Sequence, residues 1–230
     1  MAERLAEGVW YLDLGWPAPL GANAFVVDDG EVTLVDTGFP RNANRLRDQL
    51  AEAGYAVADI DRVLLTHYDL DHVGGLSRLV PELDAPAYLG EADIALLDGS
   101  WDPPWLHHKG LFHRGLRRLH RLPAGVELRP AADGDRIGGF SAHHTPGHNP
   151  GHTAYVHESL GVGLLGDLAW SKPHGLVTPI WLDSYDMRRL RESVRAFAER
   201  APPFEVAGVG HGEPILAGGR QAVRDLAARC

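Results

Sequence analysis

Cysteine and long apolar runs are both scarce in this chain of 230 residues. The single cysteine is Cys230, the last residue, so no disulfide can form within the chain. This scarcity fits a reducing compartment, and we expect a cytoplasmic protein. No window approaches the ~20 apolar residues that a membrane-spanning helix needs, and the first residues contain no apolar stretch of signal-peptide length. The sequence therefore predicts neither a membrane partner nor export.

Basic residues are outnumbered by acidic ones. Lysine and arginine together number 22 against 31 aspartates and glutamates, which gives a formal net charge of −9. An acidic protein does not attract a polyphosphate chain by default, so no nucleic-acid partner is expected. The arginine-rich run at residues 114–121 is interpreted as the solvated face of a helix. We expect a small-molecule substrate as the partner, and the sequence indicates no oligomeric state.

Side chains that commonly bind metals are concentrated directly after an apolar run. Residues 63–65 predict a buried strand, and within six positions the chain then places His67, Asp69, Asp71 and His72. Carboxylates so close to each other repel and must be desolvated together, and a bound cation is the simplest compensation. A solvated polar loop is the other interpretation. Four ligand types in so short a segment favour the metal site.

This segment resembles the His-x-His-x-Asp-His signature of the metallo-β-lactamase superfamily, which follows a similar strand and supplies ligands to two metals. Residues 34–38, Leu-Val-Asp-Thr-Gly, are similar to the early strand-Asp-Thr-Gly element of the same family. The departure from the signature is Asp69, which stands where the second histidine is usual. Its hard oxygen should favour iron or manganese relative to zinc, without excluding zinc.

The remaining ligands of the family have counterparts in the same order along the chain. His148 ends a Thr-Pro-Gly-His turn, Asp167 ends an apolar strand, and His211 lies between two glycines. Each of these motifs is weak alone, because a Gly-Asp or Gly-His-Gly is usually a turn. Their order after the main signature makes the resemblance extend from residue 36 to residue 213.

The resemblance implies a division of the ligands between two divalent ions. One ion would be bound by His67, Asp69 and His148, the other by Asp71, His72 and His211, with Asp167 bridging them. The expected ions are zinc, with manganese or iron as alternatives. Three aspartates leave a residual positive charge on two such ions, which favours a bridging hydroxide as the nucleophile. The catalytic carboxylates are expected to be Asp71 and Asp167.

Short apolar runs alternate with helical stretches along the chain. Strands are predicted at residues 9–14, 24–28, 32–36, 63–65, 87–89, 126–128, 139–144, 153–157, 162–165 and 205–209. Helices are predicted at residues 40–54, just after 72, at 91–97, from an N-cap at Ser184 through 197, and at 216–228. Periodicity alone gives an α/β or α+β protein. The resemblance implies an α+β four-layer αββα sandwich, as one domain over residues 1–230.

Residues 100–122 are the stretch least similar to the family. In that fold the corresponding region commonly overhangs the metal cleft, so Trp101, Trp105, Leu111 and Phe112 are candidates for an apolar substrate wall. The alternative is an inserted helix whose leucines pack on the core. Trp170 is a further candidate for contact with substrate. His152 could contact the substrate or support a metal ligand from behind, or it could be a structural histidine of its Pro-Gly-His turn. The four histidines of the stretch are expected to be ordinary surface residues: His107, His108, His113 and His120.

The resemblance implies a hydrolase that uses this site on an ester, a lactone or a related carbonyl or phosphoester substrate. Acyl-homoserine lactonases carry a tyrosine three positions after the bridging aspartate, where this chain has Trp170, which has no phenolic proton. Glyoxalase II enzymes have a longer helical C-terminal part than the roughly one helix that follows His211 here. The alternative is a di-iron redox protein that reduces oxygen or nitric oxide and needs a separate electron donor.

Overall fold

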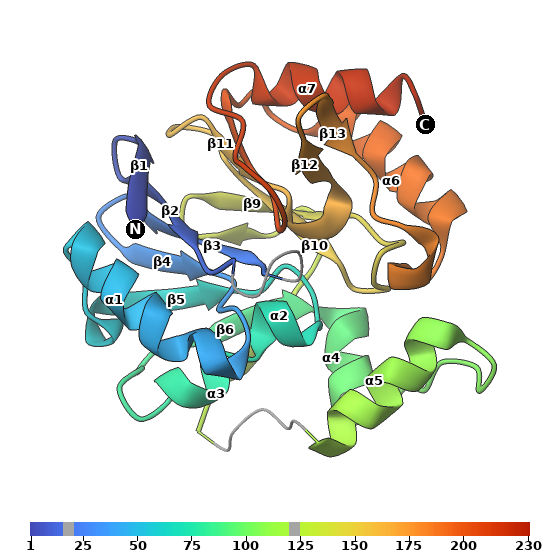
Figure 1. The fold of residues 1–230 in the computed structure, drawn as a ribbon, viewed down its shortest axis with the longest axis horizontal. Helices are drawn as coiled ribbons and strands as arrows, with labels where there is room; N and C mark the ends of the chain where they lie inside the picture. The colour runs from blue at the N-terminus through green and yellow to red at the C-terminus, as the bar shows by residue number, and fades with distance from the viewer. Residues whose placement is uncertain (16–20, 120–124) are drawn as a thin grey trace.

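Two β-sheets form the middle of the protein, seen in a computed structural model that describes residues 1–15, 21–119 and 125–230 (Figure 1). The first sheet runs in the order β1 to β7. Its strands are β1 Ala2–Ala6, β2 Val9–Asp13, β3 Asn23–Asp28, β4 Val32–Val35, β5 Ile60–Leu64, β6 Ala87–Gly90 and β7 Leu128–Ala131. Strands β1 to β4 pair antiparallel, and β4 to β7 pair parallel.

The second sheet runs in the order β14, β11, β10, β9, β8. Its strands are β8 Arg136–Ile137, β9 Phe140–His144, β10 Thr153–His157, β11 Val162–Leu164 and β14 Val206–Gly208. The pair β11–β14 is parallel and the other pairs are antiparallel. A separate small hairpin consists of β12 Trp170–Lys172 and β13 Gly175–Val177.

Helices cover the outer face of each sheet (Figure 1). The first sheet is covered by α1 Ala43–Ala53, α2 Leu70–Val73, α3 Leu76–Leu79, α4 Glu91–Asp98 and α5 His108–Leu119. The second is covered by α6 Met187–Arg200 and α7 Gly219–Ala227. Short 3₁₀ turns are η1 Pro40–Asn42, η2 Val57–Asp59, η3 Gly166–Leu168 and η4 Trp181–Asp183.

Three buried apolar layers hold the sheets and helices together. Successive side chains of a strand point to opposite faces of a sheet. In β3, Val26 therefore packs toward the helices, while Phe25 and Val27 pack between the two sheets. In β10, Tyr155 lies between the sheets and Val156 faces α6 and α7. Both faces of each sheet are thus buried, and the predicted αββα sandwich is confirmed.

Several boundaries differ from the sequence prediction. The strand predicted at residues 126–128 lies at β7, and the helix predicted just after residue 72 starts earlier, at Leu70, so that Asp71 and His72 lie in the first turn of α2. The sequence pattern missed β1, β8, β12 and β13. These strands are short or lie at the edges of sheets, where one solvated face weakens the apolar pattern.

The predicted N-cap of α6 is wrong. The side chain of Asp186, not Ser184, accepts hydrogen bonds from the backbone N–H groups of Arg188 and Arg189, at 2.9 and 3.0 Å. Ser184 ends η4 instead, and its buried hydroxyl has no hydrogen-bond partner among the described residues. In the described residues no helix is long and apolar enough to cross a membrane.

We expect the change Asp186→Ala to lower the free energy of unfolding by about 1 kcal/mol, because two N–H groups at the start of α6 lose their acceptor. Ser184→Ala is the matched control. It should leave the free energy of unfolding unchanged or raise it slightly, because the substitution removes a buried hydroxyl that has no hydrogen-bond partner among the described residues. Urea unfolding of the metal-free protein measures both. A larger loss of unfolding free energy for Ser184→Ala than for Asp186→Ala would show that Ser184 is the N-cap of α6.

Candidate metal centre

Segments that follow strands of both sheets bring the seven predicted metal ligands together. They are His67 and Asp69 after β5, Asp71 and His72 in α2, His148 between β9 and β10, Asp167 in η3, and His211 after β14. Their donor atoms form overlapping groups of three, each compact enough to hold one metal ion. The candidate site is therefore assembled from five places along the chain.

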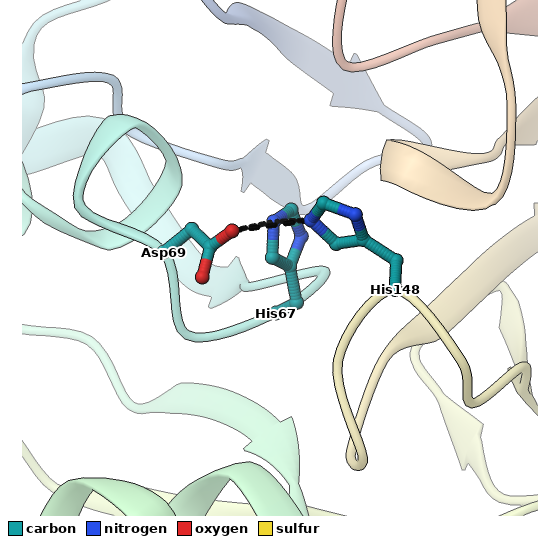
Figure 2. Close-up of side chains that lie close together, drawn as sticks. All are labelled: His67, Asp69 and His148. Atoms are coloured by element: carbon teal, nitrogen blue, oxygen red, sulfur yellow. Dashed lines mark hydrogen bonds and ion pairs between the residues drawn. The ribbon is translucent and has the colours of Figure 1, made fainter. Parts of the chain in front are cut away.

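The first group consists of His67, Asp69 and His148, and Figure 2 shows their side chains converging. His148 Nε2 lies 3.2 Å from His67 Nε2 and 3.1 Å from Asp69 Oδ2, and His67 Nε2 lies 3.4 Å from Asp69 Oδ2. A tetrahedral ion bound at about 2.1 Å separates its ligand atoms by roughly 3.4 Å. The three atoms therefore have nearly the spacing of one face of such a site, which we call the first pocket.

The second pocket is formed by Asp71, His72 and His211. Asp71 Oδ2 lies 3.7 Å from His72 Nε2 and 3.4 Å from His211 Nε2. Within the described part of the chain, His72 Nε2 and Asp167 Oδ1 are buried without a hydrogen-bond partner, and they lie 3.7 Å apart. Buried polar atoms without partners are costly, and a cation between them would remove that cost. The residues present thus fit a metal ion.

Asp167 lies between the two pockets. Its Oδ2 is 3.5 Å from His148 Nε2 of the first pocket and 3.3 Å from His211 Nε2 of the second. Gly210 leaves room for it, because a Cβ at that position would collide with Asp167 Oδ1. This placement is what a bridging ligand requires.

Hydrogen bonds behind three of the four ligand histidines, His67, His72 and His211, turn their Nε2 atoms toward the pockets. His72 Nδ1 lies 2.8 Å from Asp36 Oδ2, and His211 Nδ1 lies 3.0 Å from the carbonyl of Gly21. The hydroxyl of Thr66 lies 3.0 Å from His67 Nδ1. A ring that donates from Nδ1 keeps its Nε2 lone pair for a metal, as the outer partners of metal-binding histidines usually ensure.

Asp36 is a functional residue that was identified from the sequence only as part of the strand-Asp-Thr-Gly element. It has a φ of 58°, an uncommon conformation for a residue other than glycine. Its carboxylate accepts from the backbone N–H and the hydroxyl of Thr66 at 2.8 and 2.7 Å, and also contacts His72. The strained backbone thus places one carboxylate where it contacts both Thr66, just before the main signature, and His72, the last residue of the signature.

Asp93 and His152 support the site from further back. Asp93, the third residue of α4, accepts hydrogen bonds from the backbone N–H groups of Tyr68 and Gly151 and so joins two of the ligand-bearing segments. His152 is fully buried and its Nε2 accepts the backbone N–H of Asp167 at 2.9 Å. Of the roles considered for His152, this contact fits a histidine that supports Asp167 from behind. No motif in the sequence singled out Asp93.

Lys109, the second residue of α5, reaches the first pocket and was missed by the sequence analysis. Its Nζ lies 2.8 Å from Asp69 Oδ2, 2.9 Å from His148 Nε2 and 2.9 Å from the carbonyl of Asp183. Burial alone would raise the pKa of Asp69, but the charge of Lys109 and the neighbouring histidines together hold that pKa well below its usual range. A cationic side chain is thus buried among the metal ligands.

His113, also on α5, was predicted to be a surface residue, and this is wrong. It is buried, with Nε2 2.7 Å from Asp69 Oδ1 and Nδ1 2.7 Å from the hydroxyl of Tyr185. His107 and His108 are partly buried, and His120 lies outside the described residues. The helical spacing of Lys109 and His113 was the available signal, because residues four apart share one helix face.

The histidines of the two pockets differ in their protonation. Burial lowers the pKa of His67 well below its ordinary value, so its ring is neutral. Burial would also lower the pKa of His72, but the carboxylates of Asp36, Asp71 and Asp167 together raise that pKa to about 10. For His211 the same competition, with Asp167 as the main opposing charge, raises the pKa to about 9. Protons on His72 and His211 therefore compete with a metal ion at the second pocket and must leave to solvent when it binds.

A cavity of about 610 Å³ opens onto the metal ligands. Its floor includes Asp69, Asp71, Asp167 and His211. Its walls are mostly apolar and consist of Phe39, Leu70, Phe112, Trp170, Ile180 and Leu182, with Lys172 and Asp183 as charged members.

Only some of the candidates for the substrate wall line this cavity. Phe112 and Trp170 line it, whereas Trp101, Trp105 and Leu111 are exposed and do not. Trp105 packs its ring against the Arg114 guanidinium instead. The two interpretations of residues 100–122 are both partly right, because α5 buries Leu116 in the core and turns Phe112 to the cavity.

Comparison with known proteins agrees with this geometry. A family model described as the metallo-beta-lactamase superfamily matches residues 17–211. The chain belongs to that superfamily. A probable metallo-hydrolase of Bacillus subtilis, YybB, is 26% identical over 216 residues, which cover 93% of this chain and 91% of the relative.

Solved structures show the same fold. The metallo-beta-lactamase family protein TTHA1429 from Thermus thermophilus is 29% identical, with a TM-score of 0.73 over 98% of this chain and 80% of that one. TTHA1623 in a di-iron-bound form is 30% identical, with a TM-score of 0.64 over 86% and 92%. The superfamily match and the name of the Bacillus subtilis relative support a metal-dependent hydrolase, and the di-iron-bound structure supports a site for divalent ions.

We expect metal affinity at the second pocket to rise with pH up to about pH 10, because His72 and His211, with pKa values of about 10 and about 9, must lose protons before their Nε2 atoms can bind. Binding should release those protons. Calorimetric titration of metal-free protein in buffers of different ionisation enthalpy measures the release. An affinity that does not change with pH, after correction for hydrolysis of the metal, would contradict the raised pKa values.

Proposed function

We propose that the protein is a binuclear metal-dependent hydrolase that acts on an ester, a lactone or a related carbonyl or phosphoester with an apolar group. One observation carries the proposal: Asp167 lies between two pockets of ligand atoms at the floor of an apolar cavity. When bound, two divalent ions would polarise the substrate oxygen and supply a water acidic enough to attack near neutral pH.

The residues around the ions would have distinct roles. Asp167, which lies between the two pockets, would help to hold both ions. Asp71 lines the cavity next to His211, where its carboxylate can accept a proton beside the reacting centre. Lys172 and Asp183 are charged groups on the wall that can orient a polar end of the substrate.

The apolar wall favours substrates with a hydrocarbon part. Phe112 and Trp170 face the cavity from α5 and β12, on different layers of the fold. Trp170 also packs edge-on against His211, with ring centroids 5.2 Å apart. An apolar acyl or alkyl group on the wall would leave the carbonyl or phosphoryl group to the ions.

The metals proposed are zinc ions, with manganese or iron as alternatives because Asp69 contributes a hard oxygen to the first pocket. The di-iron-bound form of TTHA1623 supports testing iron directly. The cytoplasmic location and the lack of a nucleic-acid or membrane partner stay predictions.

We expect the metal-loaded protein to hydrolyse p-nitrophenyl esters and lactones, with kcat/KM rising as the acyl chain lengthens. Phe112→Ala should lower kcat/KM for long acyl chains by about tenfold and affect short ones little, since it removes apolar contact area in the cavity. Leu111→Ala is the matched control on the same helix and should change neither. Asp167→Ala should abolish turnover. No turnover of any carbonyl or phosphoester substrate by protein with two bound ions would refute the proposed function.

A further inference from the structure

Every N–H of the Lys109 ammonium group has an acceptor. A lysine ammonium has three donors and no acceptor. Here the three partners are Asp69 Oδ2, His148 Nε2 and the carbonyl of Asp183, at 2.8, 2.9 and 2.9 Å. His148 Nε2 must therefore accept, with the same lone pair that a metal would need. Asp69 Oδ2 is likewise the oxygen that faces the first pocket.

Among the described residues, no lysine or arginine contacts the ligand atoms of the second pocket. The charges that compete with a metal ion there are protons on His72 and His211, and these can leave to solvent, whereas the Lys109 ammonium stays tethered to α5. The inward atoms of the second pocket, His72 Nε2 and Asp167 Oδ1, lack hydrogen-bond partners among the described residues. Lys172, the second of the two lysines in the chain, is exposed on β12, with Nζ 6.0 Å from the centre of the Trp170 ring. The two pockets thus differ in one respect that the family signature does not show.

We propose that Lys109 competes with a metal ion for the first pocket, so that the two pockets fill in sequence, the second before the first. The inference rests on the proposed binuclear site. An ion in the first pocket must take the lone pairs of Asp69 and His148 from the ammonium. It must also overcome repulsion between two positive charges in a buried site, where water screens them little.

The displaced ammonium has a place to go. Its bond to the Asp183 carbonyl involves neither pocket, and the Asp183 carboxylate oxygen Oδ1 lies 4.0 Å from Nζ. The side chain of Asp183 is partly exposed and lines the cavity. Loading of the first pocket would therefore move Lys109 away from Asp69 toward Asp183, at the wall of the substrate cavity.

Metal titration tests the order of filling. Metal-free protein is titrated with zinc against a chromogenic chelator at about pH 9, where competition from protons at the second pocket is weak. It should bind one ion tightly and another at least about tenfold more weakly, because the buried ammonium of Lys109 opposes binding in the first pocket. His67→Ala should remove the weak step and leave the tight one. Lys109→Met, which keeps the length of the side chain without its nitrogen, should strengthen the weak step by about tenfold or more.

Lys172→Met is the matched control and should leave both steps as in the parent protein. Lys109→Gln provides a second neutral variant if Lys109→Met folds poorly by circular dichroism. Two ions bound with equal affinity by the parent protein would overturn the inference. So would a weak step that is unchanged or weaker in both neutral variants, which would make Lys109 a supporting group of the first pocket.

Amine acylation followed by peptide mass spectrometry provides a readout that needs no variant. Lys109 should be protected with one ion bound and acylated with two, while Lys172 reacts equally in both states. Protection of Lys109 in the two-ion protein would also overturn the inference. Stepwise binding of two ions without any hydrolysis would contradict the proposed function but not this inference. Hydrolysis by a protein that binds two ions with equal affinity would contradict this inference but not the proposed function.

Discussion

Burial of several carboxylates close together is the constraint on which the rest of the site depends. Asp36, Asp69, Asp93 and Asp167 are each at most 5% exposed. A buried carboxylate is stable only where hydrogen bonds or cations compensate its lost hydration. The structure meets this requirement with backbone N–H groups at Asp93, with Thr66 and a histidine at Asp36, and with side chains of α5 at Asp69. These bonds join segments far apart in the chain, so the same interactions that stabilise the charges position the metal ligands.

The αββα layers could be predicted because apolar periodicity marks the buried strands and the family signature marks their order. The strand at residues 153–157 was predicted with its observed bounds, since both of its faces are buried. The ligand positions followed from the main signature and from the order of the later motifs. Lys109 and His113 could not be found in this way, because their role depends on how α5 lies across the first pocket. The cap at Asp186 was missed for a local reason: Ser184 and Asp186 are both good capping residues, and only the observed backbone decides between them.

The replacement of the usual histidine by Asp69 has consequences beyond the choice of metal. A carboxylate has two oxygens, and here Oδ2 faces the first pocket while Oδ1 is bound by His113 and by the amide of Asn149. An imidazole could not satisfy both sets of partners from one position. Asp69, Lys109 and His113 therefore form one charged unit, in which the extra anion is balanced by a cation from α5. That unit makes the two pockets unequal and places a buried cation beside a residue of the apolar cavity, Asp69.

Asp167 lies between two candidate metal pockets of different composition. Anomalous diffraction from crystals of the zinc-loaded protein, recorded on both sides of the zinc absorption edge, tests most directly whether each pocket binds an ion. We expect two peaks, one on each side of the Asp167 carboxylate: one beside His67 and His148, the other beside His72 and His211. A single peak at saturating zinc, or peaks at other histidines such as His107 and His108, would contradict this expectation.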